Sequence, residues 1–171
     1  MDKKNAEKSL YDKDDLQQIA SLLIKSRSTL SVAESVTSGC LQTAFSLAEG
    51  ATLFFQGGIT VYQGGQKTRI LDVEPIYGEE NEFVNFSVAC QMALGSNKLF
   101  LSKYAIAITG FTQPIPDHEF KNPYAYYAIA KDQEIVLKGF VEAERNDSFS
   151  IQESYAKQIL KLFKNLLNDK N

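Results

Sequence analysis

Apolar and polar positions along the chain repeat with two different periods, which predicts helices interleaved with strands. The apolar residues from Leu16 to Leu23 follow the i, i+3, i+4, i+7 spacing of a buried helix face. Asp14 or Asp15 is expected to cap this helix, which should end near residues 26–28. The same kind of pattern predicts further helices over residues 41–48, 66–71, 85–99 and 151–166.

Short apolar runs between turn residues predict the strands. Residues 104–108 form a continuous apolar run, which is typical of a buried central strand. Residues 124–130 and 135–141 flank a polar turn and predict a hairpin. Two more strands are expected over residues 30–33 and 57–62. Because helices and strands alternate, the expected fold is α/β, with a mixed sheet covered by helices on both faces.

Two segments carry no such period. Residues 1–12 are polar and are expected to be a flexible tail, which leaves residues 13–171 as one domain. Residues 72–82 contain five acidic side chains and no basic one, so we expect an exposed loop there.

Composition narrows the class of protein. The chain has 171 residues, of which 44% are hydrophobic and 23% charged, and its net charge is -3. These values fit one soluble domain and give no reason to expect nucleic acid or a membrane as a partner. The N-terminus has no apolar stretch typical of a secretory signal, so a cytoplasmic location is expected. Two cysteines and one histidine give neither a disulfide framework nor a metal site, and no cofactor is implied.

Candidate chemistry gathers at the expected carboxyl ends of two strands, where ligands bind in α/β sheets. Residues 34–39 form a polar turn before a helix, and its backbone N–H groups could face an anion or an oxyanion. Thr109 and Gly110 end the buried strand. Arg145 lies just before the last helix, where it could pair with a phosphate or a carboxylate.

A serine nucleophile needs a base, and a buried, neutral lysine can serve as one. Ser35, Tyr62 and Lys67 therefore form a candidate Ser–Lys amidase set. Structural interpretations stay open: Ser38 as a helix N-cap, Tyr62 as an edge aromatic, and the cations as surface groups. A cysteine amidase using Cys40 and His118 is a further alternative, although a buried structural cysteine is more typical at that position.

The order of these motifs resembles the C-terminal domain of the competence/damage-inducible protein A (CinA) family. Residues 33–39, AESVTSG, resemble the family's A-E-S-C-T-G-G, and residues 55–67 match F-x-G-G-x-x-x-Y-x-x-x-x-K. Residues 107–114 occupy the place of the family's S-G-I-A-G-P turn, and Arg145 that of the arginine in G-D-R. The resemblance covers residues 14–167.

The resemblance implies a three-layer α/β/α sandwich, often dimeric, without a metal. It implies hydrolysis of the carboxamide of nicotinamide mononucleotide (NMN) to nicotinic acid mononucleotide and ammonia. In this picture Ser35 is the nucleophile, and Tyr62 and Lys67 activate it. The substrate is held by a larger set of positions: Thr37, Ser38, Gly39, Thr109, Gly110 and Arg145. The alternative is a non-catalytic member that binds a mononucleotide or a protein, favoured by the altered loop at residues 112–118 and by Tyr124, Tyr126 and Tyr127.

Overall fold

The computed structural model describes residues 11–115 and 120–169. In this part of the chain, five strands form one sheet in the order β2-β1-β3-β4-β5. The strands are β1 (Leu30–Glu34), β2 (Phe55–Thr60), β3 (Tyr104–Gly110), β4 (Tyr124–Lys131) and β5 (Glu134–Glu142). The helices are α1 (Lys13–Lys25), α2 (Cys40–Ser46), η1 (Ala51–Leu53), α3 (Gly64–Leu71), α4 (Pro75–Glu80), α5 (Phe86–Leu99) and α6 (Ser148–Asn168).

The sheet is mixed. β1 pairs in parallel with both β2 and β3, whereas β3, β4 and β5 are antiparallel neighbours. Glu34, the last residue of β1, lies beside Thr60 of β2 and Ile108 of β3. The carboxyl ends of these three strands therefore share one edge of the sheet, where the site described below lies.

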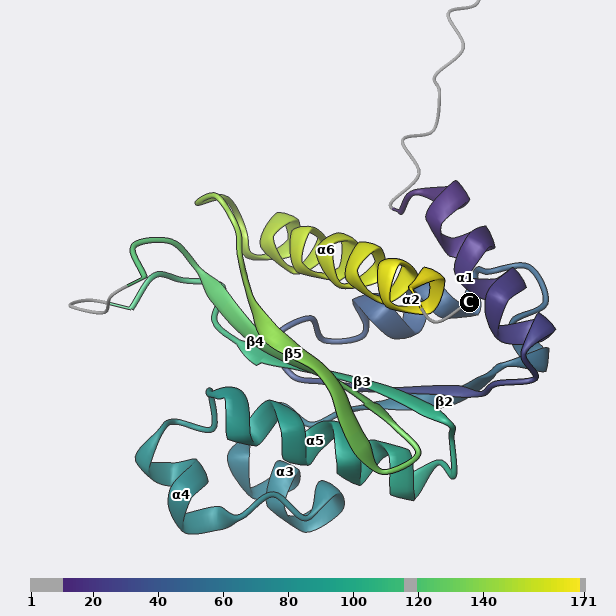
Figure 1. The fold of residues 1–171 in the computed structure, drawn as a ribbon. Coiled ribbons are helices and arrows are strands. Elements are labelled where there is room, and N and C mark those ends of the chain that lie inside the picture. The colour runs from purple at the N-terminus through teal and green to yellow at the C-terminus, as the bar shows by residue number, and fades with distance from the viewer. Residues whose placement is uncertain (1–10, 116–119, 170–171) are drawn as a thin grey trace, which may run out of the picture.

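Helices cover both faces of the sheet, with α1, α2 and α6 on one side and α3, α4 and α5 on the other (Figure 1). The alternation of side chains along β3 explains this division. Tyr104, Ile106 and Ile108 pack into the core with α1, α2 and α6, and the small Ala105 and Ala107 face α5. The predicted α/β/α sandwich with a mixed sheet is confirmed.

Four local predictions differ from the structure. Asp12 caps α1 instead of Asp14 or Asp15, and Tyr11 is buried in the core, so neither belongs to a tail. The acidic stretch contains a helix, α4, because Pro75 suits a first helical position and Glu74 caps it. The second strand begins at Phe55 rather than residue 57, because pairing with Leu30 of β1 starts there.

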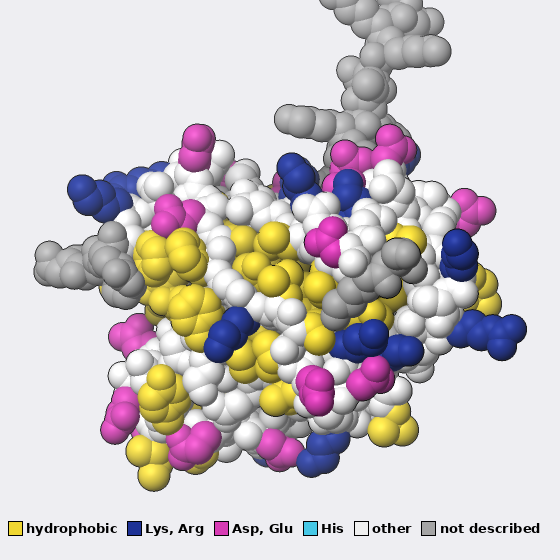
Figure 2. All heavy atoms as spheres, in the orientation of Figure 1, with side chains coloured by type: hydrophobic (Ala, Val, Ile, Leu, Met, Phe, Trp, Pro, Cys, Tyr) yellow, Lys and Arg dark blue, Asp and Glu magenta, His cyan; other side chains and the backbone are white. Residues whose placement is uncertain are grey.

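One face of the molecule carries hydrophobic side chains along β4 and β5, between α6 and α5 (Figure 2). β5 is an edge strand, and its Phe140 is 46% exposed with the Phe120 ring 4.9 Å away. An edge strand presents backbone N–H and C=O groups that can pair with another chain. None of the helices in the two described ranges is long and apolar enough to cross a membrane.

Candidate active site

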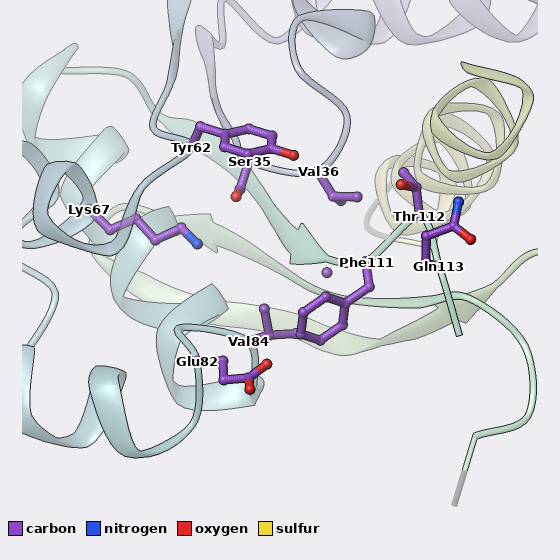
Figure 3. Close-up of a pocket in the computed structure, with 10 residues that line it drawn as sticks. Ser35, Val36, Tyr62, Lys67, Glu82, Val84, Phe111, Thr112 and Gln113 are labelled. Carbon is purple, nitrogen blue, oxygen red and sulfur yellow. The ribbon is translucent and has the colours of Figure 1, made fainter. Parts of the chain in front are cut away.

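A pocket of about 260 Å³ lies at the carboxyl ends of the parallel strands (Figure 3). Two lining residues follow β1 (Ser35 and Val36), two follow β2 (Tyr62 and Lys67), and two precede α5 (Glu82 and Val84). The remaining ones are Gly110, which ends β3, and residues 111–113 after it. The two polar turns singled out in the sequence thus meet at one pocket, because β1 and β3 are adjacent parallel strands.

The turn that carries Ser35 is held by a buried carboxylate. Glu34 is 0% exposed, and its Oε2 accepts hydrogen bonds from the backbone N–H groups of Gly39 and Leu41, both at 3.1 Å. Its Oε1 accepts from the backbone N–H of Gln42 at 2.8 Å and from the Gln42 side chain at 3.2 Å. The N–H of Ser35 donates to Ile108 O at 3.0 Å, which ties the turn to β3.

Glu34 therefore caps α2, and the prediction that Ser38 does so is wrong. Ser38 is exposed with φ +48°, and Gly39 follows with φ +107°, a left-handed conformation that suits glycine. Of the N–H groups of residues 34–39 that were expected to face a ligand, that of Gly39 is taken by Glu34. The N–H groups of Val36 and Thr37 donate to no group in the described ranges.

Lys67 is buried behind the pocket surface at 3% exposure. Its Nζ donates to Thr109 Oγ1 at 3.1 Å and to Phe83 O at 3.3 Å, and Thr109 Oγ1 itself donates to Phe83 O at 2.9 Å. Burial lowers the pKa of Lys67 from 10.5 to about 8, because desolvation disfavours the charged amine. A substantial fraction of neutral amine at mildly alkaline pH makes Lys67 able to accept a proton.

Ser35 and Lys67 both point into the pocket (Figure 3). Ser35 is 5% exposed, and within the described residues its hydroxyl makes no hydrogen bond with Lys67. The Lys67 amine instead donates to Thr109 and Phe83. The expected contact between the two side chains, directly or through one water, stays a prediction. Thr109 supports Lys67 from β3 by its hydrogen bond but is not among the lining residues, whereas its neighbour Gly110 lines the pocket.

The other predicted site residues have separate positions. Tyr62 is 65% exposed at the pocket, with its hydroxyl directed away from Lys67 in this view (Figure 3). The Thr37 hydroxyl is buried without a hydrogen-bond partner in the described chain. Arg145 does not line the pocket, and its Nη2 donates to Lys121 O at 2.9 Å. The roles of these residues toward a substrate stay predictions.

Sequence reasoning missed Glu34 and Glu82 as site residues. Glu34 is the acid directly before Ser35, and its position between a strand and a helix could have signalled a cap. Glu82 was interpreted as part of a solvated acidic loop, but it lines the pocket. For the cysteine alternative, burial raises the pKa of the Cys40 thiol and Cys40 does not line the pocket, while His118 lies outside the described residues.

A model of the CinA C-terminal domain matches residues 13–167. The chain belongs to the CinA C-terminal domain family. It is similar to a CinA-like protein of Koribacter versatilis, 33% identical over 121 residues that make up 70% of this chain and 29% of that protein. It is also similar to a CinA-like protein of Thermosynechococcus vestitus. The two are 36% identical over 104 residues, which make up 60% of this chain and 25% of that protein. The chain spans less than a third of the length of these relatives.

Solved structures support the same fold. A CinA superfamily protein from Klebsiella pneumoniae superposes with a TM-score of 0.84 at 19% identity, covering 92% of this chain and 98% of that chain. One from Enterobacter cloacae has a TM-score of 0.83 at 22% identity and covers 98% of both chains. The family resemblance predicted from the motifs is confirmed.

Proposed function

We propose that this chain is an amidohydrolase that converts NMN to nicotinic acid mononucleotide and ammonia, with Ser35 as the nucleophile. The observation that carries the proposal is that one pocket is lined by both Ser35 and a buried lysine whose pKa is about 8. A Ser–Lys hydrolase requires a nucleophile and a base whose pKa lies near the working pH. Membership of the CinA C-terminal domain family supports the same chemistry.

In the proposed reaction, neutral Lys67 accepts the Ser35 proton while Ser35 Oγ attacks the carboxamide carbon. The resulting oxyanion accepts hydrogen bonds from the N–H groups of Val36 and Thr37, which have no partner among the described groups. Lys67 then returns the proton to the amide nitrogen, the C–N bond breaks, and ammonia leaves. Water hydrolyses the Ser35 ester, which releases the carboxylate and restores the hydroxyl.

The phosphate of the substrate needs a cation, and we propose Arg145 for that role. Its loop leads into α6, and Ser148 at the start of α6 donates to Thr112 Oγ1 of the pocket at 3.1 Å. Arg145 would exchange the carbonyl of Lys121 for the phosphate when substrate binds.

The test is ammonia release from NMN by the purified chain and by Ser35→Ala. Ser46→Ala is the matched control, since Ser46 lies in the helix that follows the turn but is exposed and outside the pocket lining. We expect release by the wild type and by the control, and none above background by Ser35→Ala. Equal turnover by Ser35→Ala and the wild type would contradict the assigned nucleophile.

The alternative is a binding domain without turnover, favoured by the hydrogen bonds that hold Lys67 on Thr109 and Phe83 instead of Ser35. It predicts that NMN raises the melting temperature of the chain while no ammonia appears.

The expected homodimer is a separate proposal, supported by the position of β5 at the edge of the sheet and by its exposed Phe140. Sedimentation equilibrium of the wild type and of Phe140→Lys tests it: we expect a dimer that the substitution weakens, and a monomeric wild type would contradict it. The cytoplasmic location likewise stays a prediction.

A further inference from the structure

Glu82 presents an unpaired carboxylate to the pocket. It is an exposed residue that lines the pocket on the side of α4 and α5, as Figure 3 shows. Within the described residues its carboxylate makes no hydrogen bond and no ion pair. The same loop holds Lys67 through the carbonyl of Phe83, so Glu82 is one residue from the group that anchors the proposed base.

The backbone at Glu82 is held in a conformation that side chains rarely adopt. Glu82 has φ +53° and Phe83 has φ +56°, two successive left-handed residues that are not glycine. Such strain persists where the surroundings determine the conformation, and it is concentrated at functional sites.

Packing around Phe83 explains why the loop keeps this shape. The N–H of Phe83 donates to Gly78 O at 2.7 Å, and the N–H of Val84 donates to Asn81 O at 2.9 Å. The Phe83 ring fills the space beside Gly64 and Gly78, where an added Cβ would lie 2.2 Å and 2.4 Å from it. The Glu82 backbone is therefore placed by its neighbours before any ligand binds.

The rest of the pocket suits a flat ring. Tyr62, Val84 and Phe111 supply aromatic and apolar walls. Glu82 is the one carboxylate among the described lining residues, and Lys67 is the one amine or guanidinium. If Lys67 acts as a base, its amine must be neutral. The Glu82 carboxylate is then the charged group of the pocket lining that a bound ring would face.

We propose that Glu82 is a specificity-determining residue, whose carboxylate favours an amide carried on a positively charged heteroaromatic ring over the same amide on a neutral ring. The inference rests on the proposed function for the identity of that ring, since the ring of NMN is a pyridinium. A carboxylate beside an aromatic wall stabilises such a cation by Coulomb attraction, and it repels the negative charge of other acids.

Binding to Ser35→Ala, which removes turnover, tests the inference with NMN and reduced NMN. The two compounds share the amide, ribose and phosphate, whereas reduction adds a hydride to the ring and removes its positive charge and its aromaticity. Glu82→Gln separates the two effects, because it removes only the carboxylate that would attract the charge. We expect Ser35→Ala to bind NMN about fivefold more tightly than reduced NMN, a factor in the range of partly solvated ion pairs. Adding Glu82→Gln should remove the preference. Adding Glu80→Gln, an exposed acid outside the pocket, should preserve it.

If Glu82→Gln leaves the preference for NMN intact, the inference is overturned. Ammonia release by the wild type would still uphold the proposed function in that case. A chain that prefers NMN through Glu82 but releases no ammonia would uphold the inference and contradict hydrolysis. Failure of Ser35→Ala to bind either compound would overturn both.

Glu82→Gly separates specificity from a structural role. Glycine accepts a left-handed φ without strain, so the melting temperature of Glu82→Gly should equal or exceed that of the wild type. The preference for the charged ring should still disappear. A lower melting temperature together with an unchanged preference would show that Glu82 serves only the fold.

Discussion

The two walls of the pocket are built in opposite ways. On the Ser35 wall, a fully buried carboxylate, Glu34, is satisfied by the N-terminal N–H groups of α2. On the other wall, Lys67 is buried with two neutral oxygen partners, Thr109 Oγ1 and Phe83 O. No acid contributes to the lowered pKa of Lys67, whose cause is burial.

This difference shows how one small site can hold acids and a base without neutralising the base. A carboxylate beside Lys67 would raise the pKa of the amine and keep it protonated. Glu34 is turned toward α2, and Glu82 lies on the pocket wall without an ion pair to Lys67. Neither acid pairs with the amine, burial lowers the pKa of Lys67, and the amine remains able to accept a proton.

The largest expected effect is that of Lys67→Met, which removes the base from its wall. Ammonia release from NMN should fall about a thousandfold, the middle of the range for loss of a general base. The melting temperature at neutral pH should stay equal or rise, because a buried ammonium is removed. Lys98→Met is the control, since Lys98 is exposed and pairs with Asp72 away from the pocket. Turnover equal to that of the control would refute the role of Lys67.

Glu34→Gln tests the opposite wall. The amide would turn an N–H donor toward the backbone donors of α2, so we expect the free energy of unfolding to fall by about 3 kcal/mol, together with a lower kcat. Gln42→Ala removes the side-chain partner of Glu34 but keeps the backbone bonds, and should cost about 1 kcal/mol or less. Urea unfolding measures both. Equal losses in the two variants would mean that the carboxylate is not the main anchor.

The pH dependence of activity distinguishes a neutral from a charged Lys67. With a pKa of about 8, the neutral fraction and the rate should rise about tenfold from pH 7 to pH 9 and then level. Because the folded pKa lies below the unfolded value of 10.5, the unfolded state binds more protons between these values, and stability should increase with pH in that window. Initial rates of ammonia release measure the profile, and a flat profile would count against Lys67 as the base.

The smallest expected effect concerns the turn after Ser35. Ser38→Gly should raise the free energy of unfolding by about 0.5–1 kcal/mol, because glycine adopts φ +48° without strain. Ser21→Gly in the middle of α1 should instead lower it by about 0.5 kcal/mol, since glycine weakens a helix interior. Thermal unfolding compares the two. A loss of stability in Ser38→Gly would show that the hydroxyl contributes more than the strain costs.

Much of the fold could be predicted because its signals are local. The continuous apolar run at residues 104–108 correctly indicated the central strand, and Asn85 correctly marked the start of α5. The predictions were wrong where a residue distant in the sequence determines the local structure. Tyr11 is part of the core because its hydroxyl donates to Cys40 O at 2.7 Å, 29 residues away, and no periodic pattern reveals such a contact.

The sequence by itself determined the α/β class, the order of helices and strands, the family motifs and the serine, tyrosine and lysine of the candidate site. These follow from short-range spacing of side chains, which needs no knowledge of the partners. The tertiary structure alone decided that Lys67 is buried against Thr109, 42 residues along the chain, and that Glu34 caps α2. It also decided that Glu82 faces the pocket. The pKa of an amine and the charge of a pocket depend on solvent access and on through-space neighbours, and folding alone brings those together.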